Sequence, residues 1–96
     1  LVAVEDLATP AEGFELYPNP VNDRLALSYE FTGSASLHYE VYNMLGEKML
    51  HGASQDVHGA PYRAEVSTSE LQPGVYVVTI LDGSRILTRR TFSVVR

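Results

Sequence analysis

Hydrophobic and polar residues alternate along most of this chain, a pattern typical of half-buried β-strands. About seven segments fit a strand: residues 14–17, 25–31, 37–42, 48–51, 62–67, 75–81 and 85–96. Residues 75–81 are apolar on both faces, which predicts a central strand. In the last segment, Phe92 and Val94 are expected to point into the core, and Ile86 shares their face together with Thr88 and Arg90.

Turn signals separate these segments. Pro18-Asn19-Pro20 ends the first strand because two prolines remove two backbone donors. Gly46 lies where a hairpin needs a positive φ, and Asp82-Gly83-Ser84 predicts a second hairpin. Residues 52–61 are expected to form a loop, and residues 68–74 a turn too short for a stable helix. The chain is therefore predicted to be all-β, an immunoglobulin-like antiparallel β-sandwich of about seven strands.

The length and composition of the chain limit the number of domains, and its charge is unevenly distributed. The chain has 96 residues, 45% apolar and 20% charged, which fits one globular domain. Residues 1–13 are expected to be a linker from a preceding domain and a candidate cleavage region, and residues 14–96 the domain itself. The first 84 residues hold 12 acidic and 3 basic residues, a net charge of −9, whereas the last 12 hold four arginines and no acid. Such an acidic body argues against nucleic-acid binding.

The chemistry of an enzyme is not apparent. Cysteine is absent, which excludes a thiolate metal site and a cysteine nucleophile. His51, Asp56 and His58 flank a loop, but their spacing matches no established zinc pattern. His38 has the outward parity of a surface residue, and no Gly-x-Ser-x-Gly elbow occurs. We therefore expect no catalytic residue, no metal site and no cofactor.

Six tyrosines in a chain of this length raise the alternative of a carbohydrate-binding module. Most of them share the face of apolar neighbours and are expected in the core, Tyr76 above all. Only Tyr42 has the parity of an exposed ring, and tryptophan is absent. Sugar binding through these rings is therefore the weaker hypothesis.

Four segments, taken together, resemble the C-terminal sorting domain (type A) of the type IX secretion system. In chain order they are Tyr17-Pro18-Asn19-Pro20 with Asp23-Arg24-Leu25, Val41-Tyr42-Asn43-Met44-Leu45-Gly46-Glu47-Lys48-Met49, Val66-Ser67 through Leu71-Gln72-Pro73-Gly74-Val75-Tyr76-Val77-Val78, and Arg89-Arg90-Thr91-Phe92-Ser93-Val94-Val95-Arg96. Each motif alone is weak, but their order and spacing fit the family from about residue 14 to residue 96. Where the family usually carries Lys before the terminal aliphatic residues, this chain has Arg89 and Arg90, so charge is kept and contact geometry differs.

The resemblance implies an address label rather than an enzyme. Its implied partners are the type IX translocon and a sortase-like peptidase, and the cargo is released or joined to anionic lipopolysaccharide. Its implied location is the periplasm in transit, then the outer-membrane surface or the medium. The residues implied in recognition are Arg89, Arg90, Thr91, Phe92, Ser93, Val94, Val95 and Arg96. The other family residues are expected to be mainly structural: Tyr17, Pro18, Asn19, Pro20, Gly46, Gly74 and Tyr76.

Two alternatives stay open at this point. The chain could be a non-catalytic binding or spacer module of a surface protein, for a glycan or a protein partner. Pairing of two chains through edge strands, to give a dimer, is the other. Arg89 and Arg90 have a second interpretation as charges that keep an edge strand soluble, and because successive residues alternate, one of the two is expected to face the interior or an interface.

Overall fold

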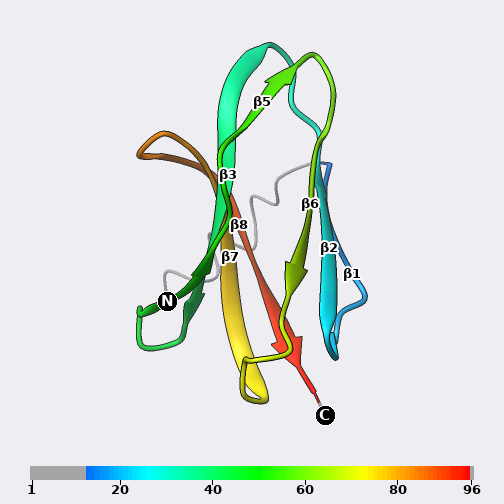
Figure 1. Ribbon diagram of the computed structural model, residues 1–96, viewed down its shortest axis with the longest axis vertical. Helices are drawn as coiled ribbons and strands as arrows, with labels where there is room; N and C mark the ends of the chain where they lie inside the picture. Colours follow the sequence, from blue (N-terminus) through cyan, green and yellow to red (C-terminus); the bar gives the residue numbers. More distant parts are fainter. Residues whose placement is uncertain (1–12, 96) are drawn as a thin grey trace.

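Two antiparallel sheets lie face to face in the computed structural model, which describes residues 13–95. Residues 13–95 form eight strands and no helix: β1 (Phe14–Tyr17), β2 (Arg24–Tyr29), β3 (Ser34–Asn43), β4 (Lys48–His51), β5 (Gln55–His58), β6 (Tyr62–Ser67), β7 (Gly74–Asp82) and β8 (Arg85–Val94). One sheet has the order β1-β2-β6, and the other has the order β4-β3-β7-β8 with β5 also paired to β3 (Figure 1). This is the predicted β-sandwich.

The core fills the space between the two sheets. Leu25 and Leu27 of β2 and Val78 and Ile80 of β7 belong to this core, and each of the four side chains is at most 1% exposed. β7 lies between β3 and β8, and its residues 78–81 are all buried. The apolar residues on both faces of residues 75–81 therefore correctly predicted a central strand, which has a neighbouring strand on each side.

The expectation of a loop over residues 52–61 is wrong in its middle. β5 pairs with the first half of β3, from Ser34↔His58 to Leu37↔Gln55. Val57 supplies its single buried side chain, and the other three residues of β5 are exposed. One apolar residue in four gives no readable alternation, so the sequence pattern could not indicate this strand.

A bulge in β8 reverses the faces of its first residues. The register of the β7–β8 pairing shifts between Ile80 and Leu81, and the additional residue on β8 is Leu87. As a result Leu87 packs against the core, while Ile86 lies on the outer face and is 50% exposed. The prediction that Ile86 shares the face of Phe92 is therefore wrong, because strict alternation does not survive a bulge.

Gly46 closes the β3–β4 hairpin with a φ of 88°, as the sequence predicted. The turn is fixed by Asn43, whose Oδ1 accepts hydrogen bonds from the backbone N–H groups of Leu45 at 2.9 Å and Glu47 at 3.0 Å. No heavy atom lies within 4 Å of a Cβ built at Gly46, so space is not what requires glycine here. The positive φ alone requires it.

The substitution Gly46→Ala is expected to lower the free energy of unfolding by about 1 kcal/mol, because a Cβ disfavours this backbone region. Urea unfolding followed by circular dichroism measures it. Gly46→Asn is the matched control, since asparagine tolerates a positive φ better and should lose less. Equal stability of all three proteins would contradict the conformational explanation.

Candidate functional site

The terminal segment, residues 89–95, comprises the end of β8, at one edge of the five-stranded sheet, and the residue that follows it. Its side chains alternate between the core and the surface. Phe92 and Val94 are only 2% exposed, whereas Val95 is 47% exposed. In Figure 1 the strand runs to the C-terminus at the lower end of the sandwich. Arg96, the last residue implied in recognition, lies outside the described residues.

The two arginines of the terminal segment point to opposite faces of β8. Arg90 lies opposite Val78, on the core side, and its Nη1 donates a hydrogen bond to the backbone oxygen of Phe14 at 2.6 Å. This bond connects β8 to β1 of the other sheet. Arg89 lies opposite Thr79 and lines a groove on the outer face. The pair is therefore not one basic patch, because Arg90 joins the sheets and Arg89 is presented outward.

The Tyr17-Pro18-Asn19-Pro20 segment leaves β1 and runs to the end of β8. Both of its X–Pro peptide bonds are cis. The Oδ1 of Asn19 accepts a hydrogen bond from the Ser93 N–H at 3.1 Å. The N–H of Val21 donates to the Ser93 oxygen at 2.8 Å, and the Val21 oxygen accepts from the Val95 N–H at 2.9 Å. The first family motif is therefore bonded directly to the last.

The other two motifs complete the same end of the sandwich. The ring of Tyr76 stacks on that of Phe92 with centroids 5.8 Å apart, and its hydroxyl donates to the Gln72 oxygen at 2.6 Å. Asn43, from the β3–β4 hairpin, pairs with Tyr76 across the sheet. Gly74 begins β7 opposite Val94. The first and third motifs thus meet the last one where the terminal segment ends, and the second motif is joined to them through β7.

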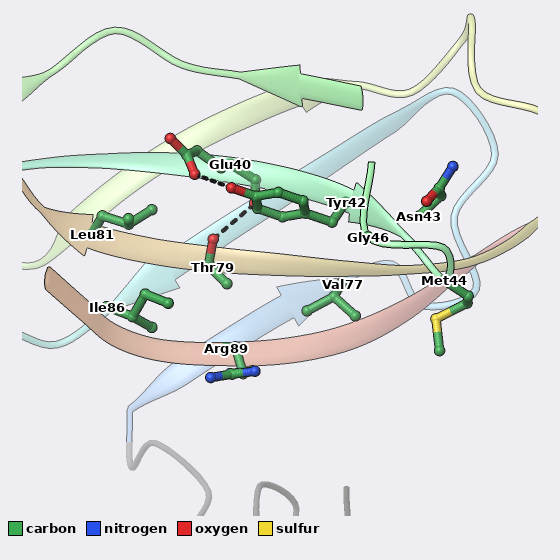
Figure 2. Close-up of a pocket in the computed structure, with 10 residues that line it drawn as sticks. All are labelled: Glu40, Tyr42, Asn43, Met44, Gly46, Val77, Thr79, Leu81, Ile86 and Arg89. Atoms are coloured by element: carbon green, nitrogen blue, oxygen red, sulfur yellow. Dashed lines mark hydrogen bonds between the residues drawn. The ribbon is translucent and has the colours of Figure 1, made fainter. Parts of the chain in front are cut away.

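A shallow groove of about 350 Å³ opens on the outer face of the five-stranded sheet (Figure 2). Val77, Leu81 and Ile86 supply apolar walls, and Glu40 and Arg89 supply charge. Glu40 is the centre of a polar network: its carboxylate accepts from the Tyr42 hydroxyl at 2.5 Å and contacts His38 Nε2 and Lys48 Nζ, each at 3.2 Å. The hydroxyl of Thr79 donates to the Glu40 backbone oxygen at 3.2 Å.

This network holds Glu40 in its ionised form. The hydrogen bond from Tyr42 lowers the pKa of Glu40 most, burial opposes that effect, and His38 and Lys48 lower it further, so that its pKa falls to about 2. The same hydrogen bond raises the pKa of Tyr42, because it stabilises the protonated phenol beside a carboxylate. The Tyr42 hydroxyl therefore stays bonded to Glu40.

The candidate metal ligands do not come together. His58 Nδ1 contacts Ser34 Oγ at 3.1 Å, and Asp56 accepts a hydrogen bond from Ser36 at 3.0 Å, while His51 lies on β4. Within the described part of the chain, no group of three or more His, Cys, Asp or Glu residues could hold a metal ion. Within the same residues, no helix is long and apolar enough to cross a membrane.

The division of the tyrosines into buried and exposed rings differs in part from the sequence prediction. Tyr76 is a core residue as expected, and Tyr29 and Tyr39 pack against the core while remaining partly exposed. Tyr42 is only half-buried on the outer face, and its hydroxyl is occupied by Glu40. Tyr17 is 52% exposed, so it, rather than Tyr42, is the most exposed ring among them. Tyr17 comes directly before the prolines, where strand parity no longer applies.

Sequence reasoning missed two structural features of this site. The first is the side-chain amide of Asn19, a residue expected only to form part of a structural turn. The sequence did contain a signal. The prolines on both sides of Asn19 have no backbone N–H and cannot pair as in a regular strand, so the side-chain amide of Asn19 is the polar group available for pairing. The second is the Glu40 network, whose members His38, Glu40 and Tyr42 share one face of β3 at a spacing of two residues.

Comparison with known proteins supplies the fold and the family. A crystal structure of an immunoglobulin-like protein from Pseudomonas aeruginosa is similar, with a TM-score of 0.57 and 12% sequence identity. The similarity covers 86% of this chain and 90% of that one, and at this identity it shows the fold alone. None of the curated proteins matches the chain significantly.

A family profile accounts for nearly all of the described residues. The profile described as "Secretion system C-terminal sorting domain" matches residues 15–94, from within β1 to the last residue of β8. This range contains most of the four segments on which the resemblance rests. The chain therefore belongs to the family of C-terminal sorting domains of the type IX secretion system, as its four motifs indicated.

Proposed function

We propose that this domain is a sorting signal whose terminal segment is read by the type IX translocon. Its parent protein passes through the periplasm and is then exported across the outer membrane to the cell surface or the medium. A sortase-like peptidase cuts the chain near residues 1–13, and the cargo is released or joined to anionic lipopolysaccharide. The domain itself has no catalytic part in these steps.

The observation that carries this proposal is that the first and third motifs both contact the end of β8. A segment that is read by a receptor needs to be exposed and to have a defined shape. The terminal segment meets both requirements, since Val95 is half-exposed while Phe92 and Val94 anchor it in the core. Residues 17–21 on one side and β7 on the other hold this anchor in position.

Charge supports the same assignment. The last 12 residues hold four arginines and no acid, on a chain with a net charge of −5. Within the terminal segment Arg89 is directed to the outer face, whereas Arg85 lies at the other end of β8 and pairs with Asp82 at 3.8 Å. A receptor surface with complementary acidic groups would attract this end of the domain selectively, because local charge contrast orients an encounter.

A localisation experiment tests the proposal. The full chain is fused behind a periplasm-targeted fluorescent protein, in cells with a working type IX system, beside a fusion that lacks residues 95–96. We expect the full fusion at the surface or in the medium and the shortened one in the periplasm. The deletion is this short because Phe92 and Val94 belong to the core, so a longer deletion would also unfold the domain.

Two further fusions ask whether charge is read. Arg89→Ala should reduce the exported fraction, and Arg63→Ala, which removes an exposed arginine from β6, should leave it unchanged. A thermal melt of each purified chain checks that folding is intact. If the full fusion stays in the periplasm while an established sorting domain is exported, the proposal fails, and a binding or spacer module becomes the function to test.

A further inference from the structure

We propose that Asn19, Pro20 and Val21, together called the clasp, hold the terminal segment in the conformation in which it is recognised. Asn19 is then a positioning residue for the sorting signal, acting through Ser93. This inference rests on the proposed function, and it assigns a role to a motif that would otherwise be only a turn.

The clasp occupies the outer edge of β8, on the side away from β7. Val21 forms a parallel bridge with Val94, and both side chains are buried. The amide of Ser93 donates to Asn19, its carbonyl accepts from Val21, and the amide of Val95 donates to Val21. β7 pairs with the opposite edge as far as Gly74↔Val94. The end of an edge strand is thus paired on both sides, which an edge strand ordinarily is not.

Asparagine is specifically suited to this place. In a regular parallel ladder, the Ser93 amide would donate to the backbone carbonyl two residues before Val21, which is that of Asn19. Here the side-chain carbonyl of Asn19 accepts instead. Pro18 and Pro20 enclose the residue, fix the backbone on both sides and leave the side chain as the acceptor. In the Pro-Asn-Pro sequence the side-chain oxygen of Asn19 therefore accepts the hydrogen bond from Ser93 that a backbone carbonyl would accept in a regular ladder.

The consequence is a defined conformation of the terminal segment. The last residues of a domain are poorly ordered unless something ties them down. The clasp ties the chain through Val95, one residue beyond the end of β8. A receptor then meets a strand that is already extended, and binding does not have to order it.

Hydrogen exchange of the purified 96-residue chain tests the geometry. Asn19→Ala should make the Ser93 amide exchange about fivefold faster, the effect of losing one hydrogen bond. Asn19→Asp keeps a carbonyl-type acceptor and should retain most of the protection. Asn22→Ala is the matched control, since its exposed side chain makes no hydrogen bond to the described residues. Unchanged exchange at Ser93 in Asn19→Ala would overturn the clasp.

Export of the same variants, as fusions, tests the role in sorting. Asn19→Ala should be exported less than the unaltered chain, while Asn19→Asp and Asn22→Ala are exported normally. If Asn19→Ala raises the exchange rate of the Ser93 amide and the fusion is still exported fully, the clasp exists but does not position the signal, and the inference is wrong. If the unaltered fusion is not exported at all, the proposed function fails and this role falls with it, whereas the exchange data still decide whether the clasp holds the chain end.

Discussion

Phe92→Ala is expected to lower the free energy of unfolding by about 3–5 kcal/mol, the usual cost of truncating a buried aromatic side chain. Phe92 is 2% exposed and stacks on Tyr76 with ring centroids 5.8 Å apart. Its removal leaves a cavity between the sheets and an unsupported Tyr76 ring. A loss of this size is a large fraction of the stability of a domain of 96 residues, so part of the protein should be unfolded at 37 °C.

Urea unfolding with a fitted m-value measures this effect, and Val95→Ala is the matched control. Val95 lies three residues further along and is 47% exposed, so its truncation should cost little. An equal effect of the two substitutions would show that β8 does not anchor the core. The terminal segment thus contains both buried residues such as Phe92, which stabilise the fold, and exposed residues such as Val95, which a receptor can reach. When a variant in this segment is exported less, its free energy of unfolding must therefore be measured as well.

Much of the fold was accessible from the sequence because most strands have one face in the core. The alternation over residues 37–42 indicated β3, and the continuous apolar run of residues 75–81 indicated β7. The failures have physical causes. β5 buries only Val57, so its pattern carries no period, and the bulge at Leu87 reverses the face of Ile86. Pairing register and bulges depend on the neighbouring strand, which a local pattern does not contain.

The candidate site was predicted as four separate segments, and the structure shows that the first and third meet the last at the end of β8. Nothing in the local sequence indicates that Asn19 and Ser93, 74 residues apart, share a hydrogen bond. That contact follows from the topology, which brings the loop after β1 and the end of β8 to the same end of the sandwich (Figure 1). The network around Glu40, by contrast, joins residues that are close in the sequence. His38 and Tyr42 each lie two residues from Glu40, on the same face of β3.

The stability of the domain is expected to fall between pH 4.5 and about 2 because Glu40 must then take up a proton. The pKa of Glu40 is lowered from 4.5 to about 2, chiefly by the hydrogen bond from Tyr42 and also by His38 and Lys48. In that range the unfolded chain binds the proton more readily than the folded one, so acid favours unfolding. The contribution is complete above pH 4.5 and is lost as the pH falls toward 2; its size is on the order of 3 kcal/mol.

Glu40→Gln isolates this contribution from that of the other carboxyl groups. Its side chain accepts the Tyr42 hydrogen bond but carries no charge, so it should be less stable than the unaltered chain at pH 7 and equally stable near pH 2. Glu65→Gln is the control, because Glu65 pairs with Arg24 at 3.3 Å on the exposed surface, where such a pair contributes little. Urea unfolding at a series of pH values gives the two differences. A constant gap between Glu40→Gln and the unaltered chain over the whole range would mean that Glu40 stabilises the sheet by packing and hydrogen bonding alone, and not through its charge.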